Sequence, residues 1–256
     1  MSRIRIGVQL HPQHTSYAEF ADAVRRAEDL GVDTIWNWDH FYPLYGAKDG
    51  PHFEGWTLLT AMATLTTRAE IGCLVTCNSY RNPNLLADMA RTVDHISGGR
   101  LICGIGSGWF ERDYAEYGYE FGTAPGRLKN LARDLPIIKE RWGKLNPAPL
   151  RNPIPLLIGG GGEKVTLKLT AQHADLWNSF GPPEKYQHKN QVLNDWCAQL
   201  GRDPSSIERT VSIQPSDLDS LDAFVAAGAQ HIIIESGAPF DTAPLKRLVD
   251  WRHARG

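Results

Sequence analysis

The sequence predicts an α/β fold of the (β/α)8 barrel type. Three observations predict it: β and α patterns alternate strictly along the chain, eight such units can be counted, and no linker or low-complexity segment separates them. Strict alternation implies a parallel sheet with right-handed crossovers. The 256 residues give about 32 per unit, which is what a strand, a helix and two turns consume in a barrel of this type. We therefore expect residues 1–256 to form a single TIM-barrel domain.

Each of the eight units begins with a short strand pattern. Apolar or β-branched runs predict strands at residues 4–10, 33–40, 70–78, 100–106, 154–159, 175–180, 209–214 and 231–235. Trp36 and Trp38 share one face of the second strand, which we interpret as packing against the helices.

A helix is predicted after every strand. The first opens at Ser16, which forms a capping-box pattern with Glu19, and ends at Gly31. Seven more are expected at residues 56–67, 85–96, 127–142, 164–173, 184–200, 218–227 and 245–253. Two strand-to-helix loops, 41–55 and 107–126, are long, so we expect them to build most of a pocket.

Composition excludes several classes of protein. Lys plus Arg is 27 and Asp plus Glu is 29, and a net charge of −2 argues against nucleic-acid binding. No apolar run reaches the ~18 residues of a membrane span, and the N-terminus enters a strand pattern without a signal-peptide core. The four cysteines show no CxxC spacing. We expect reduced thiols in a cytoplasmic protein.

Polar side chains follow several predicted strands, at the end where barrels carry their active sites. His11, Asn178 and Glu235 are of this kind. The spacing of His11 and His14 is not that of a metal-binding HxH pair, so we expect a substrate contact at His11 and no metal site.

Asp39 and His40 adjoin at the end of the second strand, where both side chains can reach one pocket. A histidine can move a proton near neutral pH, and a carboxylate can accept hydrogen bonds from ring amides. This pair is the predicted catalytic centre.

Two glycine-rich strand ends predict ligand binding. Residues 159–162 are Gly159, Gly160, Gly161 and Gly162, and a helix pattern follows them. Backbone amides at a helix N-terminus bind anions, so we expect a phosphate site here. The second segment contains Gly106, Ser107 and Gly108, whose missing side chains make room for a flat group.

Together these residues resemble the bacterial luciferase-like superfamily of flavin and deazaflavin oxidoreductases, over nearly the whole chain. The resemblance is carried by residues 30–36 with Asp39-His40, 71–76 with Arg81-Asn82-Pro83, 98–101, 104–109, 116–118, 154–160 and 174–175. It is closest to the branch that uses the deazaflavin coenzyme F420.

The resemblance implies roles for particular residues. Asp39 would hydrogen-bond the deazaflavin ring, and His40 would lie at the face where hydride moves. A non-prolyl cis peptide behind the ring would map to Cys73-Leu74. The implied cofactor-binding residues are Asp39, Cys73, Leu74, Thr76, Gly106, Ser107, Gly108, Gly159, Gly160, Gly161 and Gly162.

The chain departs from the sugar-phosphate dehydrogenases of this branch. Trp109 stands where they have an acidic residue, Glu111 comes two residues later, and Gly181-Pro182-Pro183 replaces a lysine-bearing loop. With Phe41, these differences favour a more apolar substrate. The expected substrate contacts are His11, Phe41, Trp109, Glu111 and Asn178.

We therefore expect hydride transfer between F420 and a small, fairly apolar organic substrate, and the family resemblance also implies a possible homodimer. An FMN-dependent monooxygenase on the same scaffold is the nearest alternative. From another class, a phosphate-sugar isomerase or aldolase barrel would use the glycine turn for substrate phosphate and Glu235 as its base. A further alternative is a cofactor-binding protein without turnover.

Overall fold

Nine parallel strands form one sheet in the computed structural model, which describes residues 3–255. The strands are β1 (Arg5–Leu10), β2 (Thr34–Asn37), β3 (Glu70–Cys73), β4 (Thr76–Cys77), β5 (Cys103–Gly106), β6 (Leu156–Gly159), β7 (Leu176–Phe180), β8 (Glu208–Ile213) and β9 (His231–Ser236). Their order is β3-β2-β1-β9-β8-β7-β6-β5-β4. A parallel bridge between Ile71 and Leu101 brings the two ends of the sheet together, so the predicted barrel is confirmed.

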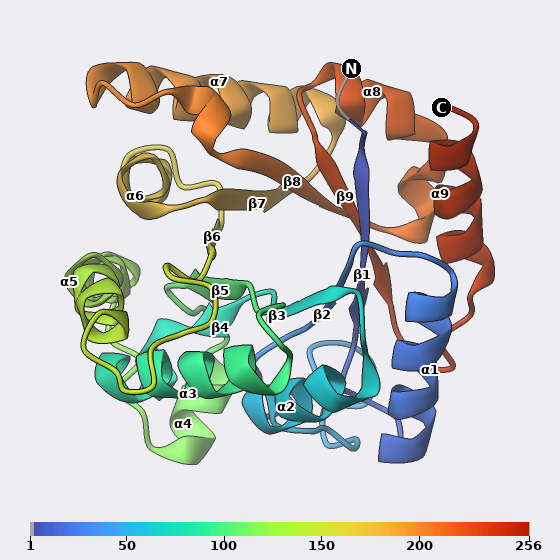
Figure 1. Cartoon of the computed structure of the whole chain (residues 1–256), viewed down its shortest axis with the longest axis horizontal. Helices are drawn as coiled ribbons and strands as arrows, with labels where there is room; N and C mark the ends of the chain where they lie inside the picture. The colour runs from blue at the N-terminus through green and yellow to red at the C-terminus, as the bar shows by residue number, and fades with distance from the viewer. Residues whose placement is uncertain (1–2, 256) are drawn as a thin grey trace.

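Helices surround the ring of strands on its outside (Figure 1). They are α1 (Tyr17–Asp29), α2 (Gly55–Leu65), α3 (Pro83–Ile96), α4 (Glu111–Tyr117), α5 (Ala124–Trp142), α6 (Thr166–His173), α7 (Pro183–Gln199), α8 (Leu221–Ala226) and α9 (Ala243–His253), with short 3-10 turns η1 (Asn78–Tyr80), η2 (Pro204–Ser206) and η3 (Pro215–Ser220). Ser16 caps α1 through the predicted capping box with Glu19. The predicted helix 218–227 is divided between η3 and α8.

The third predicted strand, residues 70–78, is split into β3 and β4. Between them lie Leu74 and Val75, whose peptide bond is cis. The position Cys73-Leu74, to which the family resemblance mapped this bond, is therefore wrong by one residue. The backbone N–H of Leu74 still donates to the Asn37 carbonyl at 2.8 Å, so the chain leaves the strand ladder only after that residue.

Helix α4 is absent from the sequence prediction, which left residues 107–126 as a loop. The helix has seven residues and ends at Gly118, whose φ of 71° is the left-handed conformation that glycine adopts without strain. A helix this short shows little apolar periodicity, which is why the sequence pattern missed it.

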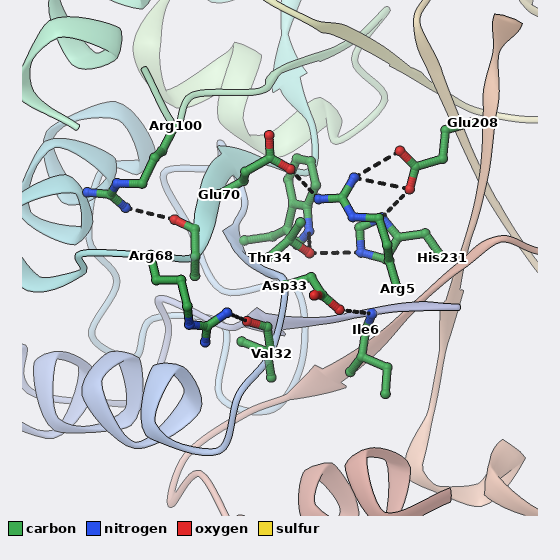
Figure 2. A network of polar contacts seen from close by, with 12 residues as sticks. Arg5, Ile6, Val32, Asp33, Thr34, Arg68, Glu70, Arg100, Glu208 and His231 are labelled. Carbon is green, nitrogen blue, oxygen red and sulfur yellow. Dashed lines mark hydrogen bonds and ion pairs between the residues drawn. The ribbon is translucent and has the colours of Figure 1, made fainter. Parts of the chain in front are cut away.

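The inside of the barrel has three levels. At the N-terminal ends of the strands, charged side chains form a network that Figure 2 shows, with the Arg5 guanidinium between Glu70 and Glu208. Above it lies a small apolar cluster, made of Trp36, Leu74, Ile102, Leu157, Leu176 and Ile233. The C-terminal ends of the strands surround a cavity.

The N-terminal network also includes His231, which is fully buried. Its Nδ1 lies 3.1 Å from a Glu208 oxygen, and its Nε2 lies 2.9 Å from the Thr34 hydroxyl. Burial lowers the pKa of His231 and outweighs the opposing effect of the Glu208 charge. The network therefore joins β1, β2, β3, β8 and β9 far from the cavity.

Candidate functional site

The cavity lies at the C-terminal ends of the strands and has a volume of about 320 Å³. Eleven residues predicted from the sequence line it: Asp39, His40, Leu74, Thr76, Gly106, Ser107, Gly108, Trp109, Gly159, Gly160 and Asn178. Glu235, which the sequence placed at the active-site end of a strand, also lines it. The structure adds lining residues that were not predicted as site residues: Gln9, Trp38, Leu44, Tyr45, Val75, Cys77, Thr166, Phe180 and Ser212. Only five lining residues come from the two long loops, so the strand ends build most of the pocket.

Other predicted site residues do not line this cavity. Cys73 points out of the barrel into the main core and is 1% exposed. Phe41 stacks on Tyr117 with ring centroids 3.9 Å apart, and Glu111 is an exposed residue at the start of α4. Gly161 and Gly162 lie beyond the cavity in the turn before α6, and His11 is behind Trp38, on which it stacks at 4.3 Å.

The interpretation of Trp36 and Trp38 as helix-facing was wrong. The Trp36 indole donates to the Thr34 hydroxyl at 2.7 Å inside the barrel, and Trp38 forms a wall of the cavity. Alternation along β2 shows that Trp36 and Trp38 share a face. Because both faces of a barrel strand are apolar, the sequence does not show which face points into the barrel.

Asp39 is completely buried, and both of its carboxylate oxygens are engaged. The Arg81 guanidinium donates to them at 2.6 and 2.9 Å, and the backbone N–H of Cys77 donates at 2.9 Å. Arg81 also pairs with Glu54 at 2.6 Å. Burial lowers the pKa of Arg81, but the charges of Asp39 and Glu54 outweigh it and raise that pKa, so the guanidinium stays protonated. The pair fixes the end of β2 against β4 and α2.

His40 forms a buried dyad with Asp113 of α4. The Nδ1 of His40 lies 2.8 Å from one Asp113 oxygen, which also accepts from the Tyr80 hydroxyl at 3.1 Å. The other oxygen accepts from the backbone N–H groups of Phe41 and Tyr42 at 3.2 and 3.1 Å. Because Asp113 can only accept, Nδ1 of a neutral His40 carries the proton and Nε2 is the basic nitrogen.

Sequence reasoning did not find Asp113, which lies 73 residues after its partner on the unpredicted helix α4. Burial and the neighbouring Cys77 and Asp113 raise the pKa of Tyr80, so its hydroxyl remains a donor to the carboxylate. The rings of Trp38, Trp109 and Phe110 contact His40 edge-on, at centroid distances of 6.1, 5.9 and 5.5 Å. The imidazole is therefore fixed at the cavity by both hydrogen bonds and packing.

A second histidine, His52, supports the Trp38 wall. The Trp38 indole N–H donates to its Nε2 at 2.9 Å, and the two rings are nearly parallel. Burial, together with the nearby His40, lowers the pKa of His52 to about 4.

This shift predicts a loss of stability in mild acid. Because the folded-state pKa lies below the ordinary 6.5, the stabilisation is complete above pH 6.5 and is lost as pH falls toward 4. Between pH 7 and pH 5, wild-type protein should lose about 1–2 kcal/mol more unfolding free energy than His52→Gln, which can still accept from Trp38. Urea unfolding at both pH values measures this. Equal losses in the two proteins would show that His52 does not carry the effect.

The glycine turn connects β6 to α6. Gly160 has a φ of 121°, and its N–H donates to the Asn178 carbonyl at 2.9 Å. Within the described chain, the N–H groups of Gly161 and Gly162 donate to no backbone or side-chain acceptor. A Cβ on Gly161 would lie 3.7 Å from the Lys189 side chain. The turn thus combines two free amides with a nearby lysine, which pairs with Glu163, a few residues before α6 begins at Thr166. Free backbone amides of this kind favour an anion.

Gly106 and Gly159 leave room for the Val75 side chain, which forms part of the floor of the cavity. A Cβ at Gly106 or at Gly159 would come within 2.8 Å of the Val75 side chain. The space that the sequence suggested for a flat ligand is therefore filled first by Val75, and a ligand would rest on that side chain.

Comparisons with known proteins show the family and the fold. A sequence model of the luciferase-like monooxygenase family matches residues 1–243. The F420-dependent glucose-6-phosphate dehydrogenase of Amycolatopsis mediterranei (strain U-32) is 28% identical over 235 residues, covering 83% of this chain and 69% of the relative. The protein of the same name from Kineococcus radiotolerans is 26% identical over 232 residues, covering 83% and 68%.

Solved structures share the fold at low identity. An F420-dependent secondary alcohol dehydrogenase with an F420-acetone adduct superposes with a TM-score of 0.84 at 16% identity, covering 97% of this chain and 98% of the other. For the FMN complex of 3,6-diketocamphane monooxygenase from Pseudomonas putida, the TM-score is 0.75 at 14% identity, with 97% and 96% covered. The fold is therefore shared by enzymes of both cofactor types.

Proposed function

Because the chain belongs to the luciferase-like monooxygenase family, we propose that it is an oxidoreductase that transfers hydride between coenzyme F420 and a small organic substrate. The observation that carries the proposal is the His40–Asp113 dyad at the wall of a cavity whose other edge is a glycine turn suited to phosphate. Relatives that are named F420-dependent support the choice of cofactor.

The residues present fit F420. Its flat ring would lie on the apolar floor formed by Leu74 and Val75, and its phosphate would meet the free amides of Gly161 and Gly162. Lys189 and Lys185 lie on α7; Lys189 is near the turn but pairs with Glu163, so Lys185 beside Phe180 would supply the positive charge for the anionic tail. Within the cavity, Asn178 and Ser212 offer polar groups to the ring edge. The paired Asp39 and Arg81 keep the wall behind the ring in place.

When bound, F420 would accept or donate a hydride, which carries two electrons. With an alcohol as substrate, in the oxidising direction, the C–H hydrogen would leave with the bonding electron pair as a hydride for the bound cofactor, the hydroxyl proton would go to Nε2 of His40, and the C=O bond would form. Asp113 stabilises the resulting imidazolium, which returns the proton in the reverse direction. Trp38 and Trp109 exclude water beside His40.

The rim of the cavity supports an organic substrate with apolar surface. Trp109 and Phe180 are 64% and 63% exposed, and Leu44 and Tyr45 lie at the same opening. Exposed large aromatic side chains beside a cavity are typical of ligand contacts.

Cofactor titration distinguishes the two oxidoreductase alternatives. We expect F420 to bind with a dissociation constant at least tenfold below that of FMN, as measured by quenching of cofactor fluorescence. Tighter FMN binding would favour the monooxygenase. An isomerase or aldolase needs neither cofactor; Glu235, the base it would use, lines the cavity, whereas among the described residues no lysine does. Turnover of a sugar phosphate without either cofactor would favour that class. A binding protein without turnover would take up F420 yet fail to reduce or oxidise any alcohol or ketone.

The glycine turn gives a separate prediction. Gly160→Ala should weaken F420 binding about tenfold, because the φ of 121° excludes a side chain and the turn must move. Gly201→Ala is the matched control: Gly201 also has a positive φ, of 65°, and a Cβ there would contact nothing within 4 Å. Fluorescence titration measures both. Equal affinities for the Gly160→Ala and Gly201→Ala proteins would show that the turn does not hold the cofactor.

We also propose that residues 1–256 work as one domain, in the cytoplasm, on small molecules and without nucleic acid. A homodimer is the expected assembly, and sedimentation analysis tests it. Among the described residues, no helix is long and apolar enough to cross a membrane. The four cysteines are buried and unpaired with one another, as expected for reduced thiols.

A further inference from the structure

A side pocket of about 210 Å³ adjoins the main cavity between the ends of β1, β8 and β9. Glu235 lines both spaces, so it lies at the boundary between them. The other polar side chains of the side pocket are His11, Gln214, Ser236 and Asp241. A substrate held at His40 can therefore extend past Glu235 into this pocket.

Glu235 is a mostly buried carboxylate with no lysine or arginine partner among the described residues, and one of its oxygens lies 3.5 Å from Nε2 of His11, which forms an ion pair with it only when protonated. Its side chain is 17% exposed, and its one hydrogen bond within the protein comes from the Gln214 amide at 2.6 Å. Within residues 3–255, no lysine or arginine lines either the cavity or the side pocket. A carboxylate withdrawn from water is costly unless a positive or donating group meets it.

His11 provides a second, independent indication. It is 8% exposed, and its Nε2 makes no hydrogen bond within the described chain, although it lies 3.5 Å from a Glu235 oxygen. Stacking on Trp38 at 4.3 Å fixes the ring. A buried polar atom without a partner is destabilising, so a ligand that forms a hydrogen bond with it gains affinity.

Lysine side chains of α7 lie instead near the glycine turn and Phe180. Lys189 pairs with Glu163, which offsets its charge, and the Lys185 ammonium lies 6.0 Å from the centre of the Phe180 ring. The opening therefore has a positive edge at Lys185, beside Phe180, and a negative edge at Glu235. An anionic cofactor tail fits the first edge, and a cationic substrate group fits the second.

We propose that Glu235 and His11 bind an ammonium group of the substrate, so that the substrates are amino alcohols or amino ketones rather than sugar phosphates. One ammonium N–H donates to the Glu235 carboxylate and another to Nε2 of His11. The identity of the reacting alcohol rests on the function proposed above, whereas the ammonium site depends only on these two side chains.

The test uses three probes that share one four-carbon frame: 2-butanol, 4-amino-2-butanol and 3-hydroxybutyrate. Dissociation constants are measured by NMR titration with the F420-loaded protein. We expect the amino alcohol to bind at least tenfold more tightly than 2-butanol, and 3-hydroxybutyrate at least tenfold more weakly than the amino alcohol. Glu235→Gln should reduce the preference for the amino alcohol over 2-butanol to threefold or less. Asp195→Asn, which removes one exposed carboxylate on α7, should leave it unchanged.

A probe without N–H groups tests the ammonium site in the wild-type protein, without any substitution. The N,N,N-trimethyl derivative of 4-amino-2-butanol retains the charge but cannot donate to His11, so wild-type protein should bind it at least tenfold more weakly than the primary amine. Equal affinities for the three four-carbon probes, preference for the anion, or unchanged selectivity in Glu235→Gln would overturn the ammonium site. Repeating the titrations without F420 separates the two proposals, because the ammonium preference persists there even if F420 does not bind.

Discussion

Replacing Asp113 by asparagine is expected to lower kcat by about 100-fold or more, within the range that general acid–base catalysis contributes. Asp113 accepts from four donors, two on each oxygen. An asparagine offers one acceptor atom and one donor atom, so its amide N–H2 must face either His40 or the two backbone N–H groups. Facing His40, it reverses the tautomer and places the proton on Nε2, where a base is needed. F420 affinity should change by less than about threefold, since Asp113 does not line the cavity.

Two comparisons show whether Asp113 acts through His40. In His40→Gln the base itself is absent, and adding Asp113→Asn to that variant should cause no further loss, because residues that act as a unit are not additive. The dependence of kcat on pH should also change in Asp113→Asn, which a purely structural role would leave intact. Glu116→Gln, an exposed carboxylate on the same helix, is the control. Additive losses in the double variant would contradict the dyad.

Removing Arg5 is expected to have the largest effect on stability. Arg5→Met leaves the Glu208 carboxylate at the N-terminal end of the barrel with only a neutral His231 nearby. Breaking a buried ion pair costs several kcal/mol. Because the Arg5 and Glu208 side chains are 28% and 23% exposed, we expect about 2–4 kcal/mol at pH 8. The melting temperature should fall by about 5–15 °C. Arg3→Met, which removes a 65% exposed arginine from a surface pair, should cost less than about 0.5 kcal/mol.

The effect of Arg5→Met should depend on pH. The Arg5 charge helps to hold down the pKa of His231, so without it that pKa rises. A folded-state pKa that is raised adds stability at low pH, because the folded protein then binds a proton that pairs with Glu208. The stability difference between wild type and Arg5→Met is therefore expected to shrink between pH 8 and pH 6. If the stability difference is constant over this range, the loss of stability in Arg5→Met comes from altered packing and not from the charge of His231.

Local patterns in the sequence were sufficient for the barrel and for much of the site. Alternating strand and helix signals predicted the order of elements, and strand ends predicted Asp39, His40 and the glycine turn. The role of Asp113 could not be predicted from the sequence. Its carboxylate lies on a short helix with little apolar periodicity, and only the fold brings it next to His40. The ion pair of Asp39 with Arg81 could not be predicted either, since the two residues are 42 positions apart in the sequence.

The glycines beneath Val75 determine how deep the pocket is. Neither Gly106 nor Gly159 needs to contact the chemistry of a ligand, yet any side chain at either position would push Val75 upward and make the opening shallower. Engineering that seeks new substrates can therefore vary the rim at Leu44 and Phe180, which do not pack on His40. Which ring system fits in the barrel depends instead on Gly106 and Gly159, because the absence of a Cβ at these positions leaves room for Val75 below the ligand.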